Sequence, residues 1–409
     1  MGREPPVRRP RILSIVGTRP EAIKMAPVAR AIAARPELDQ QLVLTGQHSG
    51  LAGFFEDIPR RQIHPLRFDP RGRTVARLRE SLHSALCYHL RWEPADLVLV
   101  HGDTASAVAG ALAAWDCGRA IGHVEAGLRS FDLERPWPEE GNRVVIDFLS
   151  DLLFAPTEAA ARNLRAEWRV HGKVYVTGNT GIDQLFHARG RAGAEAAPAA
   201  PGGRRLIVAT CHRKENQGPP MRSVCAALKR LAATLPVEVV VPLHPNRHLR
   251  SAMADLLDGQ VHIRLVEPLE HGDMVALMAR SWLIATDSGG LQEEGAALGK
   301  PVLVLRDVTE RPEGVGTANL KLVGTDEARI VEAVATLLDS PELHARMSIP
   351  SLAFGDGRAA PRIVAAIERW LKSPGFSRRR AATGRAAAPW PQARPNGARS
   401  EGPSQGNAR

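Results

Sequence analysis

The sequence has few cysteines, and none is placed for a metal site or a redox motif. Four cysteines occur among 409 residues, with no CxxC pair and no spacing typical of zinc ligands. We therefore expect no metal and no disulfide framework, and free thiols are typical of a reducing cytosol. Cys211 precedes a histidine, but we interpret it as a small buried residue rather than a nucleophile. The cysteines are Cys87, Cys117, Cys211 and Cys225.

Long hydrophobic runs are also absent. The longest apolar run, Ala105–Trp115, is far shorter than the ~18 residues that a membrane-spanning helix needs. The first eleven residues are basic, but a short strand pattern follows them in place of an apolar signal segment. We therefore expect neither membrane insertion nor secretion, and predict a cytoplasmic protein.

Acidic residues are scarce at the two ends of the chain, which explains most of the net charge of +10. Residues 1–11 contain four Arg and one Glu, and residues 373–409 contain seven Arg and one Glu. Segments with so little to bury are typically disordered, so we predict disordered basic ends. Because the rest of the chain is close to neutral, the basic charge is weak evidence for a nucleic-acid partner, and we expect none.

A chain of this length exceeds one hydrophobic core, which stops growing at about 250–300 residues. Short apolar strands alternate with helical stretches, beginning with Arg11–Val16, as in parallel βαβ units. The alternation stops at 190–205, a stretch rich in Gly, Ala and Pro, and then resumes. We predict an α/β fold with two Rossmann-like, doubly wound parallel-sheet domains and a cleft between them.

The predicted boundaries follow from this alternation. The N-terminal domain is placed at 12–178 and the C-terminal, ligand-binding domain at 179–360. A last helix is predicted over 361–372, and one possibility is that it packs back against the N-terminal domain. Residues 1–11 and 373–409 are the basic ends.

The loop after the first predicted strand carries cations suited to a phosphate. Gly17 permits a tight turn, and Pro20 suits the first turn of a helix. Arg19 and Lys24 would then offer donors beside a helix N-terminus, a favourable place for an anion. The loop has no GxGxxG fingerprint, and a plain turn is the alternative.

A second loop, Asp287–Gly290, lies between a predicted strand and a helix. Gly289 and Gly290 would let backbone N–H groups approach an anion, while Ser288 could cap the helix and donate its hydroxyl. Glu294 on that helix could accept from ribose hydroxyls, and Arg311 in a later turn could reach the same phosphates. An ordinary capped helix is the alternative here.

Four residues at strand ends or at a helix start are suited to general acid–base catalysis. Such groups typically contribute ~10²–10⁴-fold each to a rate. Glu140, beside one of them in the first turn of a predicted helix, is interpreted only as a partner of the helix dipole. The four are Asp103, Glu125, Glu139 and His212.

Seven motifs occur in order between the two basic ends. They are GTRPEAIKMAP (17–27), VHGDT (100–104), GHVEAGLR (122–129), WPEEGNR (137–143), TGNTGID (177–183), TDSGGLQEE (286–294) and RDVTERPEG (306–314). Together they resemble the non-hydrolysing UDP-N-acetylglucosamine 2-epimerases of bacteria, over roughly residues 12–371.

The resemblance implies a GT-B-like pair of domains that interconverts UDP-GlcNAc and UDP-ManNAc without cofactor or metal. In that reaction, breaking the anomeric C1–O bond acidifies the C2 proton, and elimination gives 2-acetamidoglucal and UDP. Reprotonation from the opposite face and re-addition of UDP give the epimer. The resemblance also implies a homodimer and a product destined for surface polysaccharide.

The motifs also imply residue roles. Asp103, Glu125 and Glu139 correspond to the acid–base carboxylates of the catalytic set, and His212 corresponds to a catalytic or diphosphate-contacting residue. The set that binds the UDP-sugar is Arg19, Lys24, Arg143, Ser288, Gly289, Gly290, Glu294 and Arg311. A second, allosteric UDP-GlcNAc would contact Gln47, His48, Arg213 and His244.

Two positions depart from the family pattern, and three other functions stay open. Met274 stands where members often place an aromatic residue near the uracil, and Arg73 replaces an expected Gln near the allosteric site. The alternatives are a hydrolysing epimerase that releases ManNAc and UDP, a GT-B glycosyltransferase, and a UDP-sugar sensor without turnover.

Overall fold

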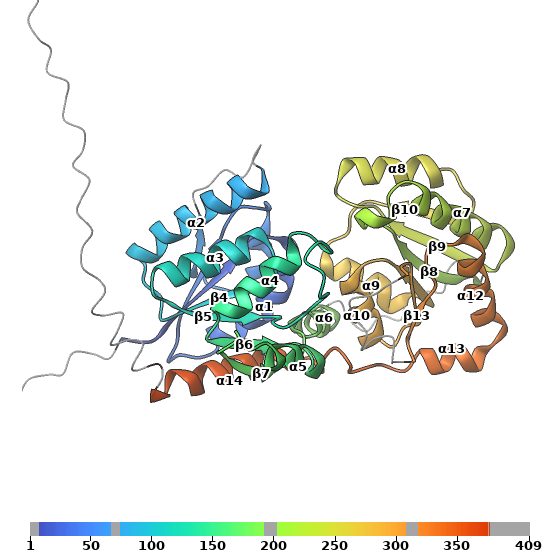
Figure 1. Cartoon of the computed structure of the whole chain (residues 1–409). Helices are drawn as coiled ribbons and strands as arrows, with labels where there is room; N and C mark the ends of the chain where they lie inside the picture. Colours follow the sequence, from blue (N-terminus) through green and yellow to red (C-terminus); the bar gives the residue numbers. More distant parts are fainter. Residues whose placement is uncertain (1–7, 67–73, 192–202, 308–317, 375, 377–409) are drawn as a thin grey trace, which may run out of the picture.

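The computed structural model describes residues 8–66, 74–191, 203–307, 318–374 and 376. It contains two separate sheets in which every strand pair is parallel (Figure 1). The first sheet has the order β3-β2-β1-β4-β5-β6-β7 and the second the order β10-β9-β8-β11-β12-β13. Each order reverses direction beside its first strand, which is the Rossmann arrangement. The predicted fold class is confirmed.

The strands are short and mostly buried on both faces, as parallel strands usually are. Those of the first sheet are β1 (Arg11–Val16), β2 (Asp39–Leu44), β3 (Ile63–Pro65), β4 (Leu97–His101), β5 (Ala120–Val124), β6 (Leu152–Ala155) and β7 (Lys173–Val176). Those of the second are β8 (Arg205–Thr210), β9 (Val237–Pro242), β10 (Ile263–Val266), β11 (Leu283–Thr286), β12 (Val302–Val304) and β13 (Leu320–Leu322).

Helices cover both faces of each sheet. On the first sheet, α2 (Val75–Trp92), α3 (Ala105–Asp116) and α4 (Glu139–Leu149) share a core on one face. The opposite face is covered by α1 (Arg19–Ala33) and α14 (Ala359–Leu371), with α5 (Glu158–Ala166) near β7. Burying each large aliphatic side chain of such cores contributes about 1.5–3 kcal/mol.

The second sheet is covered in the same way. One face holds α7 (Pro219–Thr234), α8 (Arg247–Leu257), α12 (Glu327–Asp339) and α13 (Pro341–Met347). The other holds α6 (Thr180–Arg191), α9 (His271–Arg280) and α10 (Gly289–Ala297). Because α6 also packs against α1, it joins the two domains (Figure 1). Short 3₁₀ turns lie at Leu51–Phe55, Arg60–Gln62 and Lys214–Asn216.

The last helix, α14, returns from the second domain to the first. Ile363 and Ile367 lie in the same core as the α1 side chains, and Arg35 after α1 forms a 2.8 Å ion pair with Glu368. Asp183 on α6 accepts two backbone N–H bonds at the start of α14, because Arg358 provides no side-chain cap.

The two basic segments predicted to be disordered, 1–11 and 373–409, include residues that belong to the folded part of the chain. Arg8 forms an ion pair with Asp96, and Arg11 begins β1 with ion pairs to Asp39 and Glu93. At the other end Phe376 is buried against Trp370, with ring centroids 5.1 Å apart. The folded part therefore begins before residue 12 and extends past 373, because local charge does not reveal these tertiary contacts.

None of the described helices combines the length and apolar character that crossing a bilayer requires.

Candidate active site

The carboxyl ends of the two sheets meet through side chains that follow the strands. The Arg19 guanidinium, at the start of α1, donates to the Leu269 carbonyl at 2.8 Å and lies 3.2 Å from the Glu270 carboxylate. Arg19 was predicted to face a phosphate. The structure places it at the domain junction, where it already holds the loop before α9.

The turn between β1 and α1 is fixed by a buried carboxylate. A Cβ at Gly17 would lie 1.9 Å from the Ser106 hydroxyl oxygen, so only glycine fits this turn. Glu21 is 2% exposed and accepts the N–H groups of Gly17 and Thr18 at 2.6 and 2.7 Å. It also accepts the Thr104 hydroxyl, and burial raises the pKa of Glu21. This carboxyl therefore ties the α1 turn to the loop that carries Asp103.

Lys24 and Glu125 form a buried ion pair between α1 and the end of β5. The Lys24 ammonium contacts the Glu125 carboxylate and lies 3.9 Å from that of Glu293 on α10. His101 Nε2 is 3.5 Å from the same Glu125 oxygen. Burial raises the pKa of Glu125, but Lys24 and His101 outweigh it and hold the pKa well below its ordinary value. Glu125 is therefore ionised at neutral pH, and Lys24 is its counter-ion.

Glu125 also has an unusual backbone. Its φ is +68°, a left-handed conformation that costs a non-glycine residue of order 1–3 kcal/mol. This conformation directs the chain sharply out of β5, and strain of this kind clusters at functional sites.

Asp103, at the end of β4, is held by Arg143. The guanidinium Nε of Arg143, on α4, donates to Asp103 Oδ2 at 2.7 Å, and its Nη1 donates to Glu140 at 2.9 Å. Glu140 is 1% exposed and also accepts the N–H groups of Ser130 and Phe131. The prediction that Glu140 only complements a helix dipole was wrong, because it anchors Arg143 and the loop before α4.

Glu139 differs from the other acidic side chains of the site. It is the first residue of α4, and its Oε2 atom is buried without a hydrogen-bond partner among the residues that the structure describes. A buried acceptor left unsatisfied costs about 1–3 kcal/mol. Asp287 Oδ1 of the second domain is likewise buried without a hydrogen-bond partner among the described residues, so each of these two oxygens could accept from a bound molecule.

A buried His–Asp pair positions the loops that carry Asp103 and Glu125. His123 on β5 contacts Asp147 on α4 through Nδ1 at 2.6 Å, and its Nε2 lies 2.8 Å from the Gly102 carbonyl oxygen. Asp147 also accepts the Gly127 N–H at 3.2 Å and pairs with Arg129 at 2.7 Å. The sequence analysis did not predict the His123–Asp147 pair, because a histidine inside a strand gives no local signal of its partner.

The second domain has a comparable buried aspartate. Asp287, at the end of β11, accepts the N–H groups of His212 and Arg213 at 2.8 Å each and the side-chain amide of Asn216 at 3.0 Å. The His212 ring lies near that of His244, with centroids 5.1 Å apart and planes tilted by 33°. Burial lowers the pKa of His212 despite the attraction of Asp287. The His212 ring is therefore mainly neutral at neutral pH.

The N-terminus of α10 presents backbone donors. Ser288 is the N-cap residue by position, but its side chain makes no capping hydrogen bond, which corrects the prediction that it would. The first N–H groups of a helix have no intrahelical partner. A Cβ built at Gly290 meets no other atom within 4 Å, so the helix end is open at Gly290, whereas Gly289 is buried.

Glu294 lies deeper along α10, and one of its oxygens is 3.0 Å from His271 Nε2. Met274 on α9 packs against the core of the second domain. Arg311 and Arg73 lie outside the residues that the structure describes.

The four residues predicted to bind a second ligand divide between the domains. Gln47 accepts the Ser106 hydroxyl at 2.7 Å, and His48 Nδ1 lies 3.3 Å from the Arg19 backbone nitrogen. Arg213 and His244 follow β8 and β9 of the second sheet. Burial lowers the pKa values of His48 and His244.

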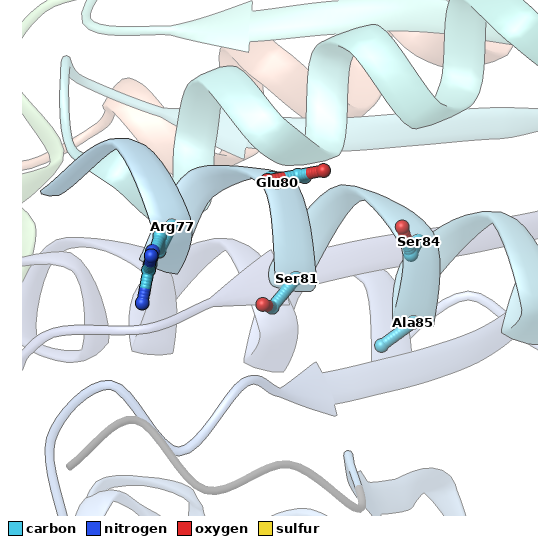
Figure 2. Close-up of a pocket in the computed structure, with 5 residues that line it drawn as sticks. All are labelled: Arg77, Glu80, Ser81, Ser84 and Ala85. Atoms are coloured by element: carbon cyan, nitrogen blue, oxygen red, sulfur yellow. The ribbon is translucent and has the colours of Figure 1, made fainter. Parts of the chain in front are cut away.

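A surface hollow of about 620 Å³ lies elsewhere, on α2 (Figure 2). Its lining side chains are those of Arg77, Glu80, Ser81, Ser84 and Ala85. None of the predicted site residues lines it.

Comparison with known proteins identifies the family of the chain. A family model described as UDP-N-acetylglucosamine 2-epimerase matches residues 30–368. UDP-N-acetylglucosamine 2-epimerase of Escherichia coli K12 is 39% identical over 374 residues, which cover 88% of this chain and 98% of the relative. The enzyme of that name from Bacillus subtilis is 40% identical over 362 residues, with coverage of 88% and 95%.

Solved structures are similar over the same span. UDP-GlcNAc 2-epimerase from Neisseria meningitidis, bound to UDP-GlcNAc, is 36% identical with a TM-score of 0.81, covering 88% of this chain and 100% of that one. The Methanocaldococcus jannaschii enzyme, in complex with UDP-GlcNAc and UDP, is 30% identical with a TM-score of 0.72 and coverage of 88% and 99%. The two-sheet architecture is thus GT-B-like, and the chain belongs to the UDP-N-acetylglucosamine 2-epimerase family.

Proposed function

We propose that this protein interconverts UDP-GlcNAc and UDP-ManNAc by elimination and re-addition of UDP, without releasing the sugar to water. The observation that carries this proposal is the set of three carboxylates at the ends of β4, β5 and the start of α4, each in a different electrostatic state. Glu125 is held ionised by Lys24, Asp103 is held by Arg143, and Glu139 has an unsatisfied oxygen.

Glu125 is suited to stabilising positive charge. A carboxylate with a strongly lowered pKa is a weak proton acceptor but a persistent anion. Loss of UDP gives the sugar ring oxocarbenium character, which is positive at C1. A fixed anion aimed at developing charge is the usual source of transition-state stabilisation. We assign this electrostatic role to Glu125.

Asp103 and Glu139 are then the two groups that exchange protons at C2. Inversion requires removal of the proton on one face and its return on the other, so two groups are needed. The Asp103 side chain is 24% exposed, against 14% for Glu125, and is therefore more accessible to a sugar. Glu139 contributes the oxygen that lacks a partner.

UDP is held by the second domain during its separation from the sugar. The open N-terminus of α10, with Ser288, Gly289 and Gly290, offers N–H donors and a favourable dipole to the diphosphate. The same domain junction is bordered by the neutral His212 ring, Arg19 and Lys24. We assign Arg311 to the same UDP-binding set. Glu294, fixed by His271, faces the ribose hydroxyls.

Proton NMR of the purified enzyme with UDP-GlcNAc in D₂O tests the proposal. We expect UDP-ManNAc to appear with deuterium at C2, because the proton exchanges with solvent during epimerisation. Free ManNAc and UDP would show a hydrolysing epimerase instead. An unchanged spectrum with the C2 proton in place would refute epimerase activity. The remaining functions would then be a glycosyltransferase or a UDP-sugar sensor.

We also propose that a second UDP-GlcNAc activates the enzyme through Gln47, His48, Arg213 and His244. The supporting contact is His48 to the Arg19 backbone, because it links this set to a residue at the domain junction. A sigmoidal dependence of rate on UDP-GlcNAc that becomes hyperbolic in His48→Ala would support activation. A hyperbolic wild-type curve would contradict it.

We further propose a cytoplasmic homodimer that supplies ManNAc for surface polysaccharide. The four cysteines are free thiols, which fits a reducing compartment. Apolar side chains are exposed at the carboxyl-terminal ends of three adjacent helices: Tyr88 and Trp92 of α2, Trp115 of α3, and Val145 and Phe148 of α4. A second copy would cover them, and sedimentation of wild type against Phe148→Asp distinguishes a dimer from a monomer.

A further inference from the structure

Away from the proposed active site, α2 and α3 bring three metal-ligating side chains together. His83 and Cys87 stand four residues apart on α2, so they project from the same face of the helix. Asp116 is the last residue of α3. One donor atom from each of the three lies within 4.8 Å of the other two.

Two of the three donor separations are close to those around a shared ion, and the Cys87–Asp116 separation is within 4.8 Å. The His83 Nε2 atom lies 3.5 Å from Cys87 Sγ and 2.8 Å from Asp116 Oδ2. Zinc bonds of about 2.0–2.1 Å to nitrogen, 2.3 Å to sulfur and 2.0–2.2 Å to oxygen place tetrahedral donors roughly 3.4–3.6 Å apart. The nitrogen–sulfur separation already fits, and the carboxylate needs to withdraw by about half an ångström.

The backbone positions of these donors are fixed by packing. Leu82 and Leu86, adjacent in sequence to His83 and Cys87, are fully buried in the core that α2 shares with α3. Asp116 lies at the carboxyl-terminal end of α3, where the helix dipole favours a cation. Donors on packed helices are held more precisely than donors on loops.

We propose that His83, Cys87 and Asp116 bind a Zn²⁺ ion that fastens α2 to α3. The Cys87 side chain is buried, whereas those of His83 and Asp116 are 30% and 56% exposed, so the ion would lie at the rim of the core that α2 shares with α3. Nitrogen, thiolate and carboxylate donors together suit zinc better than magnesium or calcium.

The site stabilises the fold and takes no part in the chemistry. Helix α3 begins beside Asp103, but Asp116 ends it eleven residues later, which is roughly 17 Å along the axis. Bound zinc should therefore raise the melting temperature by mass action and leave the turnover of UDP-GlcNAc unchanged.

The neighbouring Cys117 offers a competing reaction. Its thiol lies 3.9 Å from the Cys87 carbonyl oxygen. Hydrogen peroxide would oxidise the two thiols to a disulfide while being reduced to two molecules of water, and this would remove the thiolate that zinc needs.

Metal titration of the full chain tests the proposal. Protein without an affinity tag is stripped with a chelator, kept reduced and titrated with Co²⁺ and then Zn²⁺. We expect one saturable equivalent, a thiolate-to-cobalt charge-transfer band that zinc abolishes, and a higher melting temperature with zinc. No saturable uptake, or a cobalt spectrum without the thiolate band, would overturn the proposal.

Matched variants locate the ion. Cys87→Ala and Asp116→Asn should weaken Zn²⁺ binding by at least about 100-fold, since each removes a ligand. Cys225→Ala, which removes a buried thiol of the second domain, should bind as the wild type does. Circular dichroism of the metal-free variants separates lost binding from lost folding. Equal binding by Cys87→Ala, or a Cys87–Cys117 disulfide in freshly purified protein, would contradict the assignment.

Discussion

The two sheets share one strand order, but the loops at their carboxyl ends differ in charge and in the groups they present. The first sheet presents Asp103, Glu125 and Glu139, two of them already paired with cations. The second presents backbone N–H groups at α10, and its buried Asp287 is used to shape the His212 loop. The same architecture therefore supports anionic chemistry toward a sugar on one side and binding of a diphosphate on the other.

Under the proposed function, the two similar folds divide one reaction between them. A site for elimination needs negative charge near the carbon that becomes positive, and a site for the leaving group needs donors and a favourable dipole. These demands conflict within a single loop cluster. Placing them on opposing sheets satisfies both, and mutations on the two sides should affect different kinetic constants.

The largest effect is expected at Glu139. Glu139→Gln keeps the shape of the side chain but cannot exchange a proton, so kcat should fall by ~10²–10⁴-fold. UDP affinity, measured by calorimetry, should remain unchanged because Glu139 is not among the residues proposed to bind the diphosphate. Glu134→Gln, an exposed position in the preceding loop, serves as the control. Full activity of Glu139→Gln would refute the assignment.

A Lys24 variant tests whether the carboxylates of the first domain need their cationic partners for the stability of the fold. Lys24→Met removes the ammonium partner of the buried Glu125 carboxylate and leaves only His101 beside it, which should cost about 3–5 kcal/mol of the free energy of unfolding in urea. The double variant with Glu125→Gln should recover most of that loss. A single variant as stable as wild type would show that the pair contributes nothing.

The same pair predicts a pH dependence with a definite sign. The folded pKa of Glu125 lies below its unfolded value of about 4.3. Its stabilising contribution is therefore complete above that value and is lost as the pH falls through the lower folded pKa. Lys24→Met should show a shallower loss of stability in this acid range than wild type.

Variants of the buried aspartates Asp147, in the first domain, and Asp287, in the second, allow a direct comparison of the two domains. Asp147→Asn weakens the hold on His123 and should lower kcat, because a shift of about 1 Å in a catalytic group can cost 10²-fold. Asp287→Asn loosens the His212 loop and should mainly raise the KM for UDP-GlcNAc. Steady-state kinetics gives kcat and KM for both variants. Identical changes in the two variants would contradict the proposal that the first domain acts on the sugar and the second binds the diphosphate.

The smallest effect is expected at Gly290. Gly290→Asp places a carboxylate at the N-terminus of α10, where it opposes a diphosphate and should weaken UDP binding by roughly tenfold. Gly290→Ala is the matched control, because its Cβ would meet no other atom within 4 Å. Calorimetric titration with UDP measures both. Equal affinities would place the diphosphate elsewhere.

The sequence predicted the sheets better than it predicted the partners within the site. Alternating strands and helices suffice for two parallel sheets, since strand ends then meet at one edge. The same reasoning placed Asp103 and Glu125 at that edge. It did not show that Lys24 contacts Glu125, because one lies on α1 and the other follows β5, and their pairing depends on strand order.

The error at Glu140 has the same origin. Glu140 was interpreted from its place in a helix, whereas its partners Ser130 and Phe131 lie in the loop before it. The proximity of His83, Cys87 and Asp116 could not be predicted from the sequence either, because these side chains come together only through the packing of α2 on α3. Local patterns report local structure, and contacts between elements follow from topology.

The return of α14 has a consequence for the order in which the chain can fold during synthesis. Residues near both ends of the chain, Ile12 and Ile367, belong to one hydrophobic core, and the whole second sheet lies between them in sequence. Domains usually fold from the N-terminus as the chain emerges at about 5–20 residues per second. Here the second domain can complete its core first, while the domain that began to emerge earlier waits for its last helix.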